Sequence, residues 1–252
     1  MGPYQTSIPV HYYEINNHRQ ASPVAILNYL EEAAIRHSES VGWGIEKLLA
    51  NSRGWLLTRW SLHMQKYPQW GETVNIETWP YKFERFYATR EFRISDREGR
   101  VLGAATTLWV FFDLRRKRPV RIPPDIYDAY GTGAERMVVD EFADLPAIDE
   151  PDSKLEFRVR LSDIDTNDHV NNTKYVEWLL ETVPLSVHKG FLLSSVEIAY
   201  KKETSYGSTV LCGIKETEAG ERQTTFLHII LDRDSGTELA RARTVWQKRS
   251  KI

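Results

Sequence analysis

The stretch GRVLGAATTLW, residues 99–109, occurs a second time in altered form as GTELARARTVW, residues 236–246. Five of the eleven positions are identical at an offset of 137. Nearby, WGETV at residues 70–74 matches YGSTV at residues 206–210 at an offset of 136. Similar segments that keep their order and spacing indicate an internal repeat. The chain is therefore predicted to contain two copies of one folding unit.

The two halves also share one order of predicted elements. Each begins with a short strand, near residues 10–14 and 157–162, followed by a helix and four extended segments. Polar turns at residues 96–99 and 232–236 predict hairpins between the last two extended segments of each half. Long strands after a single early helix indicate an antiparallel sheet curled around that helix. We therefore expect an α+β fold made of two such units.

Local signals place the start of each helix. Ser22 followed by Pro23 predicts the first start, because serine caps helix N-termini and proline suits the first helical turn. Either Asn171 or Asn172 can cap the second helix. Apolar residues then recur at helical spacing in both segments. They are Val24, Leu27, Leu30, Ala33 and Ala34 in the first, and Val176, Leu179, Leu180 and Val183 in the second.

Between the halves lies an acidic segment. From Asp125 to Asp152 it holds nine acidic residues and one basic residue, with proline and glycine scattered through it. This composition is typical of a linker, so we predict a first repeat at 1–122, a linker at 123–154 and a second repeat at 155–252. A basic cluster precedes it and is either a solvated turn or a docking point for an acidic partner. Its members are Arg115, Arg116, Lys117 and Arg118.

The composition excludes several classes of protein. A net charge of -2 argues against a strongly basic nucleic-acid binder. No apolar run is long enough to span a bilayer. Cys212 is the only cysteine, which excludes an internal disulfide and a cysteine metal cluster. A reducing compartment fits this cysteine usage best, so we expect a cytoplasmic protein, and we keep a homodimer as a candidate assembly.

The polar segment DIDTNDHVNNTKY, residues 163–175, is where the two halves differ in chemistry. Aligning the two helices gives an offset of 149, which puts Asn16 opposite Asp165 and Gln20 opposite His169. A segment that only caps a helix would need similar groups in both halves. We therefore interpret the second copy as one part of an acid–base site, with Glu203 at the end of a later strand as another part. The alternatives are a solvated Glu203 paired with Lys201 or Lys202, and a structural His169 bonded to Asp165 or Asp168.

These residues resemble a known family. DIDTNDHVNNTKY resembles the D-x-D-x-N-x-H-V-N-N-x-K-Y signature of acyl-acyl-carrier-protein thioesterases. YPQWGETV at 67–74 is similar to the family's Y-P-x-W-G-D-T-V strand, although Lys66 stands where arginine is usual. Residues 106–111 resemble its S-x-W-V strand, and YKKE at 200–203 resembles its Y-R-R-E strand. The resemblance extends over nearly the whole chain.

The resemblance implies a double hotdog fold, in which two antiparallel sheets each wrap around a long helix. It also implies release of free fatty acid from acyl carrier protein, ending fatty acid synthesis, without a cofactor. The family's catalytic positions fall on Asp165, Asn167, His169 and Glu203. Some members carry cysteine directly after the glutamate, where this chain has Thr204, so a cysteine acyl-enzyme is not expected.

Further residues have expected roles in substrate binding. Backbone N–H groups near Asn171 and Asn172 suit a developing oxyanion, because the N-terminus of a helix carries partial positive charge. For the first repeat the resemblance implies an acyl-chain pocket, with Leu27, Leu30, Ala34 and Trp60 as candidates that are otherwise ordinary core residues. The basic cluster, together with Lys201 and Lys202, is the candidate surface for carrier-protein docking. The alternatives are an acyl-coenzyme A thioesterase, a non-catalytic acyl-binding protein and, with a poorer match, a hotdog dehydratase.

Overall fold

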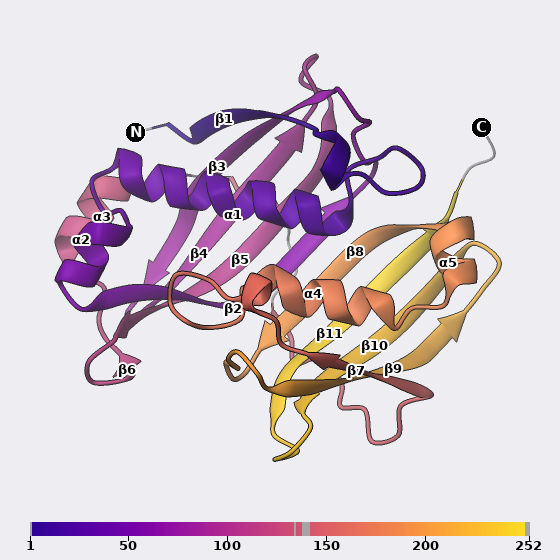
Figure 1. Ribbon diagram of the computed structural model, residues 1–252. Coiled ribbons are helices and arrows are strands. Elements are labelled where there is room, and N and C mark those ends of the chain that lie inside the picture. The colour runs from indigo at the N-terminus through magenta and orange to yellow at the C-terminus, as the bar shows by residue number, and fades with distance from the viewer. Residues whose placement is uncertain (1, 134, 138–141, 250–252) are drawn as a thin grey trace. The chain divides into compact units, whose positions relative to one another are not determined.

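The computed structural model describes residues 2–133, 135–137 and 142–249. The chain divides into two compact units, residues 1–140 and 141–252, called here the first and the second unit. In each unit one helix lies across a curved antiparallel sheet (Figure 1). This is the double hotdog arrangement, with one copy of the same design in each unit. No helix in the described ranges is long and apolar enough to cross a membrane.

The first unit is built around helix α1, Pro23–Ser40. Its strands hydrogen-bond in the order β1-β3-β4-β5-β2, all antiparallel, and the short β6 pairs with β5. The strands are β1 Tyr4–Pro9, β2 Arg53–Met64, β3 Thr73–Glu84, β4 Tyr87–Ser95, β5 Val101–Asp113 and β6 Arg118–Pro119. Two short helices, α2 Ile45–Ala50 and α3 Pro124–Tyr130, and a 3-10 turn, η1 Tyr12–Glu14, complete the unit.

The second unit repeats this plan around helix α4, Asn172–Glu181. Its strands pair antiparallel in the order β8-β11-β10-β9-β7. They are β7 Ser153–Arg158, β8 Phe191–Tyr200, β9 Thr209–Ala219, β10 Gln223–Asp232 and β11 Glu238–Lys248. A 3-10 turn, η2 Leu161–Asp163, precedes the helix, and α5 Leu185–Gly190 follows it.

The internal repeat is visible in individual hydrogen bonds. In β5 the indole Nε1 of Trp109 donates to Thr107 Oγ1 at 2.8 Å, and in β11 Trp246 donates to Thr244 at 3.0 Å. Both pairs stand at the predicted offset of 137. The helix starts also agree with the sequence, because the Ser22 side chain accepts from the Ala25 N–H at 3.1 Å. Of the two candidate caps for the second helix, Asn171 is the cap, because its side chain accepts a hydrogen bond from the Thr173 N–H at 2.8 Å.

The predicted positions of the two leading strands were wrong. The first strand ends at Pro9, before the predicted segment, and the second ends at Arg158, so only residues 157–158 of its predicted segment are strand. The turns η1 and η2 follow the two strands. In the first turn the Glu14 carboxylate accepts from the His11 backbone N–H at 2.9 Å. In the second, the Asp163 carboxylate accepts from the Arg160 N–H at 2.8 Å. Such local bonds from side chain to backbone compete with strand pairing and turn the chain toward its helix.

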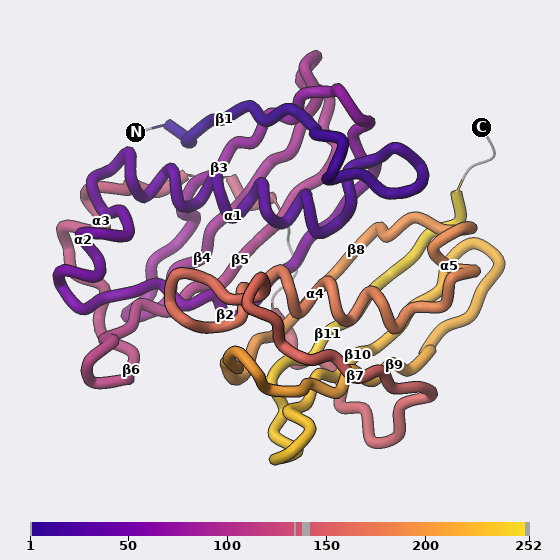
Figure 2. Tube along the Cα trace, viewed as in Figure 1, coloured from indigo at the N-terminus to yellow at the C-terminus, as the bar shows by residue number. Residues whose placement is uncertain are grey.

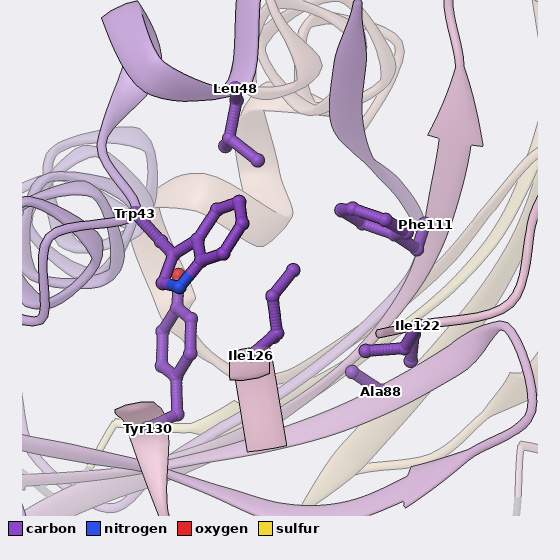
Figure 3. Close-up of a cluster of buried hydrophobic side chains, with 7 residues drawn as sticks. All are labelled: Trp43, Leu48, Ala88, Phe111, Ile122, Ile126 and Tyr130. Carbon is purple, nitrogen blue, oxygen red and sulfur yellow. The ribbon is translucent and has the colours of Figure 1, made fainter. Parts of the chain in front are cut away.

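The first unit has a second cluster of buried side chains beside the helix–sheet interface (Figure 3). Its members are Trp43, Leu48, Ala88, Phe111, Ile122, Ile126 and Tyr130. Ile126 and Tyr130 belong to α3, which lies at the start of the acidic segment at 123–154. Burial of their side chains makes this part of the segment integral to the first unit. Residues 134 and 138–141 of the same segment lie outside the described residues.

Candidate active site

A closed loop leads from η2 into α4. The Asp165 N–H donates to the His169 carbonyl at 2.8 Å, and the Asp168 N–H donates back to the Asp165 carbonyl at 3.2 Å. Asp168 adopts a left-handed backbone with φ of 61°, which a short polar side chain tolerates. The Asn171 N–H closes the loop on the Asp163 carbonyl at 2.9 Å. These bonds fix the backbone that presents the candidate catalytic residues.

The first unit contains the same loop with other side chains. The Asn16 N–H donates to the Gln20 carbonyl at 2.8 Å, and the Arg19 N–H donates to the Asn16 carbonyl at 3.0 Å. Arg19 has φ of 59°, and the Ser22 N–H closes the loop on the Glu14 carbonyl at 2.9 Å. Each residue stands 149 positions before its counterpart, as the sequence alignment predicted. Figure 2 follows the chain through both loops into α1 and α4. The backbone is therefore shared, and only the chemistry of the side chains differs.

Asp165 organises the inside of the loop. Its Oδ1 accepts from the Asn167 N–H at 2.8 Å and from the His169 N–H at 3.4 Å. Its Oδ2 faces the Asn167 side-chain amide Nδ2 at 3.4 Å. The carboxylate thus contacts the amide of Asn167 and the backbone of His169. It stabilises the turn and orients a carboxamide that can donate to a substrate oxygen.

The imidazole of His169 faces Glu203. Its Nδ1 lies 3.3 Å from Glu203 Oε2, with 40% and 61% of the two side chains exposed. This differs from the alternative of a structural His169, in which the ring bonds to Asp165 or Asp168. The physical reason is a long-range backbone bond. The Val170 N–H donates to the Thr204 carbonyl at 3.0 Å and so brings the end of β8 to the loop. The result is a solvent-accessible carboxylate–imidazole pair.

An ion pair between exposed Arg160 and buried Asp163 holds the base of the loop and was missed from sequence. The Asp163 side chain is fully buried and accepts from Arg160 Nε at 3.2 Å and Nη2 at 2.9 Å, besides the backbone N–H. Burial opposes ionisation of this carboxyl, but the hydrogen bonds and charge of Arg160 outweigh it and lower the pKa of Asp163. Glu177 of α4 accepts from Arg160 at 3.4 Å and from Lys174 at 2.7 Å. The three-residue spacings from Arg160 to Asp163 and from Lys174 to Glu177 could have indicated these ion pairs from sequence.

Two tyrosines connect the helix to the sheet beneath the loop. The Tyr200 hydroxyl, at the end of β8, donates to the Asn172 carbonyl at 2.9 Å. Tyr175 packs edge-on against Tyr200, with ring centroids 5.6 Å apart. Burial raises the pKa of Tyr175, and the nearby carboxylates of Glu203 and Asp165 raise it further. Tyr175 is therefore a neutral phenol in this setting, and it underlies the first turn of α4.

The predicted acyl-pocket residues lie in the interior of the first unit. Leu27, Leu30 and Ala34 are buried on α1, and Trp60 is buried on β2. The Trp60 ring stacks on Phe92 of β4 at a centroid distance of 6.2 Å. These side chains line one apolar interior, but they belong to a different unit from the polar loop. Cys212 is buried in β9, and burial raises the pKa of its thiol, which disfavours the nucleophilic thiolate.

The candidate docking residues are divided between the two units. Arg115, Arg116, Lys117 and Arg118 are exposed where the chain turns from β5 into β6. In the second unit, Lys201 is engaged, because its Nζ lies 2.9 Å from Glu238 Oε1. Lys202 is exposed directly beside Glu203. Of the candidate basic residues, Lys202 therefore adjoins the catalytic glutamate in sequence, and its charge helps to lower the pKa of the Asp232 carboxyl.

Comparison with known proteins agrees with this geometry. Dodecanoyl-[acyl-carrier-protein] hydrolase from Umbellularia californica is 30% identical over 97% of this chain and 67% of its own length. The structure of the 12:0-ACP thioesterase of that plant superposes with a TM-score of 0.89, at 28% identity over 98% of this chain and 94% of the other. The structure of a putative oleoyl thioesterase from Lactobacillus plantarum also superposes with a TM-score of 0.89, at 26% identity over 99% of this chain and 97% of the other.

Family models cover most of the chain. Residues 2–130 match the acyl-ACP thioesterase N-terminal domain, and residues 147–248 match the C-terminal domain. The two matches fall on the first and second unit. The resemblance that rested on short motifs is thereby confirmed over whole domains. The chain belongs to the acyl-ACP thioesterase family.

Proposed function

We propose that this protein hydrolyses the thioester of fatty acyl carrier protein and releases the free fatty acid, ending fatty acid synthesis. The observation that carries the proposal is the pair of His169 and Glu203, 3.3 Å apart, at positions where the first unit has Gln20 and Tyr67. The family to which the chain belongs supports the substrate class. A cytoplasmic location is part of the proposal, because a single buried cysteine suits a reducing compartment.

In the proposed mechanism, water attacks the thioester carbonyl directly. Glu203 takes a proton from the attacking water, and His169 holds the carboxylate in place through its ring nitrogen. Both side chains are partly exposed, so water reaches them without a tunnel. The C–S bond of the tetrahedral intermediate then breaks, and the departing sulfur takes up the proton. General-base catalysis of this kind contributes about 10² to 10⁴-fold to the rate.

The oxyanion of the intermediate needs hydrogen-bond donors. We assign this role to the Asn167 amide, oriented by Asp165, and to the backbone N–H of Asn172 at the start of α4, because the N–H groups of Asn171 and Thr173 already donate to Asp163 and Asn171. The Asn171 side chain already satisfies the Thr173 N–H, so it caps the helix rather than contacting the substrate. Removing one such donor typically costs about 10² to 10³-fold in turnover.

For the acyl chain, we propose the interior of the first unit, lined by Leu27, Leu30, Ala34 and Trp60. Apolar burial is the only driving force that a saturated chain offers, at about 0.8 kcal/mol for each methylene group. Relatives of comparable identity are named for dodecanoyl, palmitoyl and oleoyl chains, so the proposal covers the fatty acyl class as a whole. The basic residues 115–118 and Lys202 are proposed contacts for the carrier protein. A homodimer remains a proposed assembly, and light scattering tests it.

The test is incubation with acyl carrier proteins of several chain lengths and measurement of the released acids. His169→Ala and Glu203→Ala should each abolish most of the turnover. Gln20→Ala changes the counterpart of His169 in the first unit and serves as the matched control, with hydrolysis retained. Turnover at the parental rate in either catalytic variant would refute the assignment. Equal preference for acyl-coenzyme A would refute the carrier-protein specificity.

A further inference from the structure

Two large apolar side chains are exposed on either side of the proposed catalytic pair. Leu161 in η2 is 71% exposed and lies two residues before Asp163, where the loop begins. Tyr206 is 55% exposed and follows Glu203 by three residues. The two segments are joined by backbone bonds, because the Val159 N–H donates to the Ser208 carbonyl at 2.9 Å. Both side chains therefore belong to one surface of the second unit.

The first unit shows how close these two positions are. Tyr12 and Trp70 are the counterparts of Leu161 and Tyr206, at the offsets of 149 and 136 that hold for the loop. They are 72% and 54% exposed, and their rings meet edge-to-face at 5.6 Å. Together with the loop they line a hollow of about 480 Å³. Because the backbone of the repeat is shared, Leu161 and Tyr206 are neighbouring positions that form one apolar patch.

The two segments that carry this patch also carry exposed basic side chains. Arg158 and Lys202 are both exposed, and neither makes an ion pair within the described part of the chain. Arg158 precedes Val159, which bonds to the segment carrying Tyr206, and Lys202 precedes Glu203. An apolar centre containing an aromatic ring, with a charged and solvated rim, is the usual composition of a protein–protein interface. Exposed positive charge without an ion pair within 4.0 Å suits an acidic partner, although the charge of Lys202 also acts on the Asp232 carboxyl.

The substrate itself limits where a partner can sit. The thioester sulfur of the proposed substrate is attached through a flexible arm to a carrier protein. While the carbonyl lies at His169 and Glu203, the carrier must dock within the reach of that arm, on the surface around the pair. We propose that Leu161 and Tyr206 form the apolar centre of the surface on which the acyl carrier protein docks, with Arg158 and Lys202 as its basic rim. This inference rests on the proposed function and adds a partner surface to it.

The test compares two substrates that share one acyl chain, the acyl carrier protein and the acyl pantetheine thioester. The readout is kcat/KM for the acyl carrier protein divided by kcat/KM for the acyl pantetheine thioester. In Leu161→Ser and Tyr206→Ser this ratio should fall about tenfold, as expected for residues at the centre of an interface. Leu185→Ser, at a 64% exposed leucine of the same unit, and Tyr13→Ser, at an 81% exposed tyrosine of the first unit, should keep the parental ratio.

Calorimetry with the unacylated carrier protein measures docking without hydrolysis. Its dissociation constant should rise about tenfold in the same two variants and not in the two controls. An unchanged ratio and unchanged carrier binding in Leu161→Ser and Tyr206→Ser would overturn the docking surface. Equal losses on both substrates would also overturn it, because the residues would then act through the catalytic loop. A parent that binds the carrier but hydrolyses neither substrate would refute the proposed function and leave calorimetry to decide the surface.

Discussion

Replacing Asp163 by asparagine should weaken the contacts with Arg160 that hold the catalytic loop, residues 163–171, in place. The carboxylate is fully buried, and Arg160 alone supplies three of its hydrogen bonds, at 2.8, 3.2 and 2.9 Å. Asparagine keeps the size of the side chain and one acceptor oxygen. Its amide group, however, turns N–H donors toward the donors of Arg160. The substitution therefore removes the charge and mispairs the base of the loop without creating a cavity.

The expected loss follows from these contacts. A hydrogen bond to a charged group contributes about 1.5 to 3 kcal/mol, and neighbouring bonds are not additive. Arg160 is 58% exposed and regains water when released, so we expect a loss in unfolding free energy of about 2 kcal/mol at neutral pH. Because the folded pKa of Asp163 is lowered, its contribution is present above the unfolded pKa of about 3.9. It disappears as the pH falls through the folded value, and the parent and the variant then converge.

The same variant should lose activity. A displacement of about 1 Å in groups that position a substrate can cost about 10²-fold in rate, so we expect kcat to fall by about ten- to a hundredfold while the protein stays folded. The assays are denaturant unfolding at pH 7 and pH 3 and hydrolysis of acyl carrier protein. Glu14→Gln, at the equivalent position of the first unit, should lose comparable stability and keep its kcat. An unchanged unfolding midpoint in Asp163→Asn, or an equal fall in kcat in Glu14→Gln, would refute the reasoning.

Three further predictions concern single groups. Glu203→Gln should lower kcat by about 10² to 10⁴-fold while calorimetry still detects carrier binding, and a parental rate would exclude Glu203 as the base. Cys212 should resist alkylation in the folded protein at pH 8, and Cys212→Ala should hydrolyse at the parental rate, because the thiol is buried with a raised pKa. Rapid labelling or a large loss of rate would contradict this. Burial lowers the pKa of His228 to about 3, whereas its unfolded pKa is about 6.5. Between these two pH values only the unfolded state binds the proton. Stability should therefore fall by about 1.4 kcal/mol per pH unit on acidification, and His228→Gln should show a slope shallower by this amount in denaturant titrations.

Local features of the fold could be predicted from sequence, and contacts across the chain could not. The repeat was detectable because both members of a bonded pair, Thr107 with Trp109, are kept in the second copy. The cap at Ser22 was detectable because serine bonds to N–H groups within its own helix turn. The ring partner of His169 was not, because Glu203 reaches it only through the pairing of distant backbone segments. The partners considered from sequence, Asp165 and Asp168, are nearer along the chain, but Asp165 bonds to the backbone of His169.

The duplicated loop separates conformation from chemistry within one molecule. Its backbone bonds agree in the two units, down to the left-handed residue at Arg19 and Asp168. The first unit nevertheless has Gln20 in place of the imidazole and Tyr67 in place of the carboxylate. Since the conformation is common to both copies, it cannot explain why only the second has an imidazole and a carboxylate at these two positions. The first unit instead pairs His11 with Glu14, at the turn before its loop. The side chains alone make that difference. The proposed activity therefore depends on the side chains of the loop and on the hydrogen bonds of Asp163 that hold the loop in place.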